Sequence, residues 1–191
     1  TGLTNGRTYS FTVRAVNAAG VSKAAVPLDA INISGVSGYS QCAVLTNHNV
    51  TCWGRNMDVG AIRLLPSDLH NAVAVAMNGD QDGACAVTTS GTIRCWGWGW
   101  GVGSFEAGPG IPSDNGYIGI TSTYYNFCAW KVNGDVTCWG WNGYNLVSGH
   151  GDIGPVSKVI GTHEHGYCAV LKDHTHACWG NTLSVDQSTA P

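Results

Sequence analysis

The amino-acid sequence predicts an all-β protein that contains four copies of one short unit. Its eight cysteines form four pairs, and the second member of each pair follows the first by ten positions. Every unit opens with Cys-Ala and closes with Cys-Trp-Gly. Successive units begin 43, 43 and 40 residues apart, a period that is typical of propellers and solenoids. The pairs are Cys42/Cys52, Cys85/Cys95, Cys128/Cys138 and Cys168/Cys178.

Each unit is predicted to form a β-hairpin, because two short β-prone runs flank turn residues at its centre. A three-residue loop in the second and third units places Gly91 and Gly134 at the position that needs a positive φ. His48 and His174 take that position in the other two units. A positive φ is less favourable for histidine than for glycine, but it is permitted.

The same hairpin register places the two cysteines of each unit directly opposite each other. Opposed residues in an antiparallel pair lie ~4.5–5.5 Å apart at Cα, which is a separation that a disulfide can span. We therefore predict the disulfides Cys42–Cys52, Cys85–Cys95, Cys128–Cys138 and Cys168–Cys178. Zinc is the alternative, but zinc sites usually place two cysteines closer in sequence than any two are here. Persistent disulfides predict a secreted or cell-surface protein.

Further short strands are predicted around each hairpin. A short apolar segment precedes every hairpin, and a stretch rich in Gly, Asn or Pro follows every Cys-Trp-Gly. Three or four short strands per unit, joined by polar loops, describe a propeller blade. The four hairpins are expected at 42–52, 85–95, 128–138 and 168–178.

These units resemble the repeat of the regulator of chromosome condensation family. The resemblance implies a seven-bladed propeller of four-stranded blades, so that the four units within 27–191 form part of a ring. The Gln-Leu-Gly that ends the family's repeat is missing from all four units. The Trp-Asp dipeptide of the tryptophan–aspartate propeller repeat is absent as well. Besides the Cys-Ala and Cys-Trp-Gly groups, the matching positions are Gly35, Asn56, Gly60, Gly91, Gly134, Asn142 and Gly161.

In residues 1–26, Tyr9, Phe11, Val13 and Ala15 alternate as a half-buried strand requires. This segment resembles the C-terminal end of a fibronectin type III domain. The resemblance implies the last two strands of such a domain, which leaves an open edge suited to pairing with another chain. Either the chain is an excerpt of a longer protein or neighbouring copies complete one another. The other matching positions are Leu3, Asn17 and Gly20.

Seven of the eight tryptophans fall into two groups. Four follow the second cysteine of their unit, and we expect these to pack between blades. Trp98, Trp100 and Trp141 are additions that the repeat does not require. They form either an exposed contact for sugars or proteins or further packing between blades. The tryptophans of the first group are Trp53, Trp96, Trp139 and Trp179.

Composition and motifs argue against several classes of function. Only 11% of the residues are charged and the net charge is −3, so the basic footprint of a nucleic-acid-binding protein is missing. No apolar run is long enough to insert into a membrane.

Two histidine groups, near His163 and near His174, lie too far apart in the hairpin register to share a metal ion. No catalytic motif is evident, so we expect no enzyme, no cofactor and no metal. Asn32 and Asn49 begin N-glycosylation sequons.

The sequence thus predicts a non-enzymatic extracellular protein with a structural or adhesive role. Completion of its open β-edges by other copies would assemble it into a fibre or a surface layer. The alternative is a secreted propeller that binds carbohydrate or protein through Trp98, Trp100 and Trp141. Expected partners are other copies, other extracellular proteins or glycans. Guanine-nucleotide exchange, the activity that the repeat resemblance implies, is disfavoured because disulfides do not persist in the nucleus.

Overall fold

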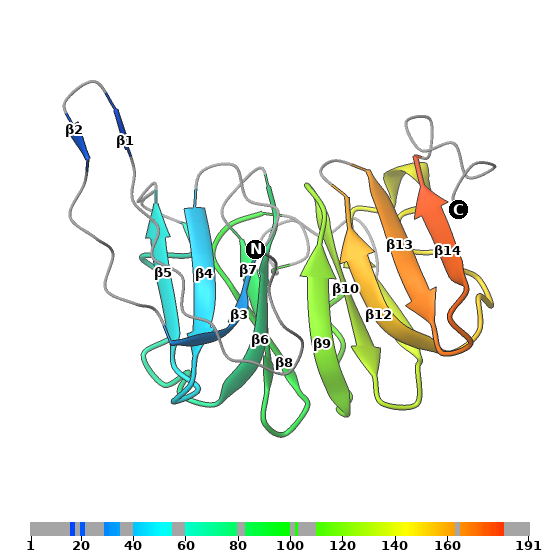
Figure 1. Cartoon of the computed structure of the whole chain (residues 1–191), viewed down its shortest axis with the longest axis horizontal. Coiled ribbons are helices and arrows are strands. Elements are labelled where there is room, and N and C mark those ends of the chain that lie inside the picture. The colour runs from blue at the N-terminus through cyan, green and yellow to red at the C-terminus, as the bar shows by residue number, and fades with distance from the viewer. Residues whose placement is uncertain are drawn as a thin grey trace, which may run out of the picture.

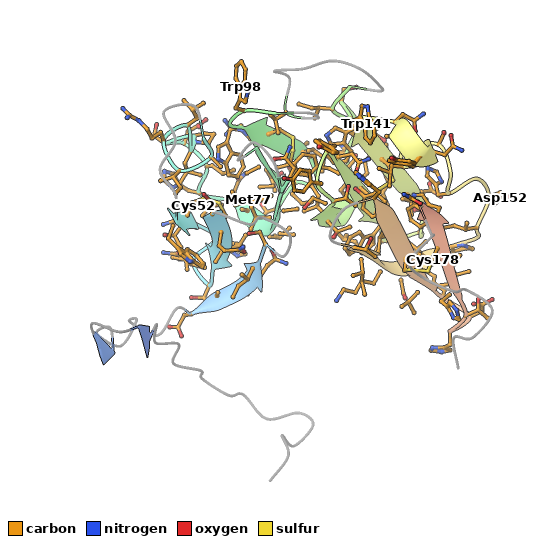
Figure 2. All side chains as sticks on the ribbon, turned by 90° about the horizontal axis from the view of Figure 1, so that it is seen from above. Cys52, Met77, Trp98, Trp141, Asp152 and Cys178 are labelled. Atoms are coloured by element: carbon orange, nitrogen blue, oxygen red, sulfur yellow. A yellow bond between two sulfur atoms is a disulfide. The ribbon has the colours of Figure 1, made fainter. Side chains whose placement is uncertain are left out.

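The computed structural model describes residues 16–17, 20–21, 29–34, 40–54, 60–79, 83–99, 102, 110–162 and 165–181. Four antiparallel sheets of three strands lie side by side in an arc (Figures 1 and 2). This arrangement confirms the all-β prediction of four disulfide-stapled propeller blades. The described residues contain no helix with the length and apolar character that a membrane crossing requires.

Each blade contains one strand from the apolar segment and two from the hairpin. In every sheet the first strand pairs with the second, and the second with the third. A short 3₁₀ helix, η1 (Gly143–Asn145), follows the third blade. Blade 1 is β3 (Ala30–Ile33), β4 (Ser40–Leu45) and β5 (Val50–Gly54), and blade 2 is β6 (Ala72–Met77), β7 (Ala84–Thr88) and β8 (Ile93–Trp96). Blade 3 is β9 (Tyr117–Ser122), β10 (Asn126–Lys131) and β11 (Val136–Gly140), and blade 4 is β12 (Val156–Gly161), β13 (Gly166–Leu171) and β14 (His176–Gly180).

A separate two-stranded ribbon precedes the blades. β1 (Val16–Asn17) pairs with β2 (Gly20–Val21) in an antiparallel register. The strand predicted over residues 9–15 lies outside the described residues. The fibronectin-like module over 1–26 and its boundary with the propeller repeats at 27–191 therefore remain predictions.

The predicted hairpin register is confirmed in all four blades. The loop of blade 1 closes with a hydrogen bond from the Leu45 N–H to the Asn49 carbonyl, at 2.8 Å. Since hydrogen-bonded and non-hydrogen-bonded pairs alternate from that point, Cys42 and Cys52 fall at a non-hydrogen-bonded pair, where the two backbones approach most closely. Each of the four disulfides joins Cα atoms 4.0 Å apart. The loop residues predicted to have positive φ do so: His48, Gly91, Gly134 and His174.

The blades pack through two kinds of face. Because side chains alternate across a strand, one face of each sheet carries the disulfide and the other carries the tryptophan of Cys-Trp-Gly. We call these the Cys face and the Trp face. The Cys face of each blade packs on the Trp face of the next in three apolar clusters. As predicted, Trp96, Trp139 and Trp179 are buried there. Trp53 differs, with 43% of its surface exposed, because no described blade covers the Trp face of blade 1.

A hydrogen bond from each hairpin tip also links successive blades. The carbonyl of the residue with positive φ accepts the N–H of the residue that opens the next blade's first strand. The three bonds, from Ala72 to His48, from Tyr117 to Gly91 and from Val156 to Gly134, all measure 3.0 Å. The backbones approach so closely that a Cβ on Gly134 would lie 2.7 Å from the Cα of Pro155.

Candidate functional site

Aromatic side chains gather at the loops between blades 3 and 4. Tyr125, Trp141 and Tyr144 surround the imidazole of His165, and we call these four residues the aromatic cluster. The centroid of the His165 ring lies 4.8 Å from that of Tyr144, 5.8 Å from that of Tyr125 and 5.9 Å from that of Trp141. Tyr144 is 54% exposed. The cluster therefore presents an aromatic surface to solvent.

Three separate loops contribute to the cluster. Tyr125 lies in the turn between β9 and β10, Trp141 follows β11, and His165 precedes β13. The Trp141 N–H donates to the Tyr125 carbonyl at 3.3 Å. Asn126 donates from Nδ2 to the carbonyl of Trp141 at 2.9 Å. The ring of Trp141 also lies against Gly143, where a Cβ would come within 2.1 Å of it. Buried polar contacts therefore fix the position of the Trp141 backbone.

The loop that carries Tyr144 is held from both sides. Asn142 Oδ1 accepts the N–H groups of Val147 and Ser148, at 2.9 and 3.2 Å. The buried indole of Trp179 donates to the Leu146 carbonyl at 3.0 Å. These contacts keep the loop in a conformation that few residues adopt.

Two consecutive non-glycine residues of this loop have a positive φ. The φ of Tyr144 is 57° and that of Asn145 is 59°. Such conformations cost free energy and gather at functional sites, where the surrounding structure enforces them. Tyr144 is thus presented to solvent from a loop that is already ordered. A ligand that stacks on it would not have to order the loop.

The cluster contains polar groups but no catalytic arrangement. His165 Nδ1 is a buried atom with no hydrogen-bond partner among the described residues. The exposed amides of Asn142 and Asn145 lie on the same loop. Aromatic faces beside amide groups suit stacking on a sugar ring or on an apolar side chain. The chemistry that this arrangement supports is binding.

Two carboxylates with shifted pKa values lie elsewhere and belong to surface ion pairs. A bidentate hydrogen bond from Arg94, at 3.0 and 3.1 Å, lowers the pKa of Asp68. A hydrogen bond from Lys131, at 2.5 Å, lowers the pKa of Asp114 and raises that of Lys131. Both carboxylates are therefore held in the charged form by neighbouring cations, which is a structural role.

The three tryptophans predicted as ligand contacts have different positions. Trp141 belongs to the aromatic cluster and is half-buried. Trp98 is 40% exposed, and Figure 2 shows it on the same side of the molecule as Trp141 but apart from it. Trp100 lies outside the described residues. A ligand contact at any of the three remains a prediction.

The two sequon asparagines lie in and beside blade 1. Asn32 Oδ1 accepts the Val75 N–H at 2.8 Å, across the boundary with blade 2. Asn49 Oδ1 lies 3.0 Å from His70 Nδ1 in an exposed pair. Glycosylation of Asn32 and Asn49 remains a prediction.

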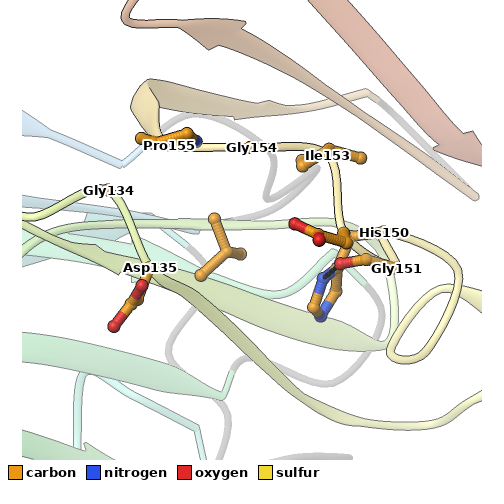
Figure 3. Close-up of a pocket in the computed structure, with 9 residues that line it drawn as sticks. Gly134, Asp135, His150, Gly151, Ile153, Gly154 and Pro155 are labelled. Carbon is orange, nitrogen blue, oxygen red and sulfur yellow. Dashed lines mark hydrogen bonds between the residues drawn. The ribbon is translucent and has the colours of Figure 1, made fainter.

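A cavity of about 300 Å³ lies where the hairpin tip of blade 3 meets the segment that leads into β12 (Figure 3). Its apolar side chains are those of Val136, Ile153 and Pro155, and its polar ones are those of Asp135, His150 and Asp152. Among the described residues, no group of three His, Cys, Asp or Glu side chains is placed to hold a metal ion. His165 and His174 lie at opposite ends of β13.

The two ends of the arc present apolar faces. On the Trp face of blade 1, Ile33 is 58% exposed and Trp53 is 43% exposed. On the Cys face of blade 4, Ile160 is 48% exposed and Val170 is 40% exposed. The completion of open β-edges by other copies remains a prediction, and the exposed apolar surface of the end blades lies on their faces. A comparison of the four units could have located these faces, since the same positions are apolar in several units.

Four similar blades, stapled by disulfides and packed face to face, define the chain as a propeller protein. No protein-family model matches the chain, and no curated protein matches it either. Solved structures do match it. The entire ectodomain of the receptor kinase CR4 from Physcomitrella patens is 23% identical, with a TM-score of 0.63 over 88% of this chain and 49% of that one.

Two further structures extend the comparison. The CRINKLY WD40 ectodomain of the Arabidopsis thaliana receptor kinase ACR4 is 20% identical, with a TM-score of 0.61 over 78% of this chain and 50% of that one. Yeast RCC1 (Prp20), in its complex with Kap60, is 19% identical, with a TM-score of 0.56 over 78% of this chain and 42% of that one. The chain therefore spans about half the length, or less, of these structures. The likeness shows a shared propeller fold, which agrees with the repeat resemblance.

Proposed function

We propose that the chain is a non-enzymatic structural or adhesive module of the extracellular space that self-associates through its open blade faces. Four disulfides support an oxidising compartment. Two of the similar solved structures are ectodomains of receptor kinases, which supports the same location. Association with other proteins is a function that requires no catalytic group.

One observation carries this proposal. Trp53 is 43% exposed, whereas the tryptophans at the same position in blades 2, 3 and 4 are buried by the preceding blade. The Trp face of blade 1 therefore has the apolar composition of an internal blade interface. Burying such a face against another protein is more favourable than leaving it exposed to water. Association through both ends of the arc would give a closed ring or an open filament, depending on the rotation between copies.

Sedimentation velocity of the purified, oxidised chain over a range of concentrations tests the proposal. We expect concentration-dependent association for the wild type and a monomer for Trp53→Ser. Trp98→Ser is the matched control, because Trp98 has a similar exposed fraction but lies outside the blade faces. This control is expected to associate like the wild type. A wild type that stays monomeric at every concentration would contradict the proposal.

The aromatic cluster favours a second candidate function, the binding of carbohydrate or protein by a secreted propeller. Its exposed member, Tyr144, is presented by an ordered loop beside two amides. Screening the chain against a glycan array tests this function, with Tyr144→Ala expected to abolish any binding found. Val132→Ala, at an exposed hairpin tip, should bind like the wild type. Equal array signals for Tyr144→Ala and Val132→Ala would contradict ligand binding at the aromatic cluster.

A further inference from the structure

The two open faces of the arc are opposite members of one repeated contact. Inside the molecule a Cys face always meets a Trp face, and this contact occurs three times. Blade 1 has its Trp face open, and blade 4 has its Cys face open. We infer that the Cys face of blade 4 in one copy docks on the Trp face of blade 1 in a second copy, head to tail. This inference rests on the proposed self-association and specifies its interface.

Residues at equivalent positions show that the Trp face of blade 1 is apolar in the same way as the Trp faces that are covered in the other blades. The residue paired with the alanine of Cys-Ala is Ile33 in blade 1, and it is Val75, Ile120 and Val159 in the others. The latter three are buried, whereas Ile33 is 58% exposed. An apolar side chain is thus retained at a position that no described blade covers.

The Cys face of blade 4 shows the same relationship. Val170 occupies the position that Val44, Val87 and Trp130 take in the preceding blades. Those three side chains are buried by the following blade, whereas Val170 is 40% exposed. Ile160, which pairs with Cys168, is exposed beside it. The face that would be covered by a fifth blade therefore carries exposed apolar side chains.

Backbone hydrogen bonding sets the register of the docking. Within the molecule, the hairpin-tip carbonyl of one blade accepts the N–H of the residue that opens the next blade. The tip of blade 4 is His174, whose φ of 71° matches the 65° of His48. The residue that opens blade 1 is Ala30. Docking head to tail would align the His174 carbonyl with the Ala30 N–H of the second copy, as His48 aligns with Ala72.

The two open faces favour a second copy of the chain as the occupant. Blade 4 of the second copy carries a Cys face, which is the kind of face that covers a Trp face at each internal contact. A contact between like faces would instead oppose two Trp faces or two Cys faces, a combination that occurs at none of the three internal contacts.

Polar residues beside Val170 predict that this docking is reversible. Lys158 and His176 both pair with Val170 and therefore share the Cys face of blade 4. Their equivalents in blade 2 are Ala74 and Ile93. Covering a lysine requires its charged end to reach solvent past the interface. The contact between copies is therefore weaker than the contacts inside one copy.

Two complementary variants test the inference. Ile33→Glu places a charge on the Trp face and leaves the Cys face intact, whereas Val170→Glu does the reverse. Both residues are exposed in the single copy, so both variants are expected to fold. Each should lose self-association by at least about 30-fold, the effect of altering a central interface residue. Val132→Glu, at an exposed hairpin tip, is the control and should associate like the wild type.

The decisive measurement is sedimentation velocity of an equimolar mixture of the two variants, with one of them labelled. One intact pair of faces remains in the mixture, so we expect a 1:1 dimer that grows no further. Self-association of either variant alone would overturn the head-to-tail contact, because a contact between like faces survives in one of them. A monomeric mixture beside an associating wild type would also overturn it while leaving the proposed function in place. A monomeric wild type would remove both.

Discussion

Tyr167 donates its hydroxyl hydrogen to Oδ1 of Asn126, 2.7 Å away, across the boundary between blades 3 and 4. Both residues are fully buried. The hydroxyl of Thr123 donates to the same oxygen, and the amide nitrogen of Asn126 donates to the Trp141 carbonyl. Polar groups buried in this way stabilise one arrangement when all of them are satisfied. The network therefore connects the blade interface to the aromatic cluster.

Replacing Tyr167 with Phe should weaken folding in a pH-dependent way. At pH 7 the variant loses a buried hydrogen bond, which costs about 0.5–1.5 kcal/mol of unfolding free energy. Burial also raises the pKa of Tyr167, whereas an unfolded tyrosine titrates near pH ~10. The stability that the phenol contributes is present below that pH and is lost as the pH rises above it. Phenylalanine has no such loss.

Urea denaturation of the wild type and Tyr167→Phe between pH 7 and pH 11 measures this effect. The difference in stability between the two proteins should narrow as the pH rises above the ordinary tyrosine pKa. A difference that stays constant over the whole range would show that the Tyr167 phenol ionises as freely in the folded chain as in the unfolded one.

Trp179→Phe should destabilise the contact between blades 3 and 4. The substitution keeps an aromatic ring but removes the N–H that the buried carbonyl of Leu146 accepts. Loss of this donor costs about 1–3 kcal/mol. Trp53→Phe is the matched control, and we expect it to change stability by less than about 0.5 kcal/mol because Trp53 lies on an open face. Chemical denaturation under monomeric conditions compares the two, and equal effects would contradict the role of the indole bond.

Local features of this fold were predictable from the sequence, and relations between blades were less so. The cysteine pairs and the positive φ at His48 follow from the register of a single hairpin. Burial of Trp53 depends instead on whether another blade precedes it, which the repeat pattern does not specify. Trp141 was identifiable from the sequence as a candidate contact, because it is an addition to the repeat. Tyr144 follows it in the same loop, but Tyr125 and His165 come from two other loops, and no local pattern connects the three loops.

The four disulfides should differ in their resistance to reduction. The Cys128 and Cys138 side chains are buried between blades 3 and 4, whereas Cys168 and Cys178 are half-buried on the open face of blade 4. Reduction requires access to a sulfur atom, so in dilute solution Cys168–Cys178 should open before Cys128–Cys138. Limited reduction followed by alkylation and peptide mapping gives the order. Head-to-tail docking covers the face of blade 4, so protection of Cys168–Cys178 should increase with protein concentration.

Deleting one disulfide should produce a moderate loss of stability. The double variant Cys168→Ala/Cys178→Ala opens a short loop, and the chain-entropy model gives a loss of about 2–3 kcal/mol. Denaturant unfolding of the monomer measures this loss. A change in unfolding free energy below about 0.5 kcal/mol would mean that the disulfide contributes little to the stability of the blade 4 hairpin.

Gly134→Ala should disrupt the hydrogen bond by which a hairpin tip links two blades. Gly134 has a φ of 101°, and a Cβ there would lie 2.7 Å from the Val156 nitrogen. The nitrogen cannot move away without breaking its bond to the Gly134 carbonyl. Backbone strain of about 1–3 kcal/mol and a lost hydrogen bond of about 1 kcal/mol together predict a cost of about 2–4 kcal/mol.

Gly151→Ala separates backbone strain from the tip contact. Gly151 also has a positive φ, of 49°, but a Cβ there would meet no atom within 4 Å. This variant should therefore cost only about 1–2 kcal/mol, the strain of a left-handed residue. Denaturant unfolding compares the two variants. The difference between them measures the tip contact, which is the same contact that would join His174 to Ala30 of a second copy. Equal losses would mean that the tip bond contributes little within the arc and could not set the register between copies.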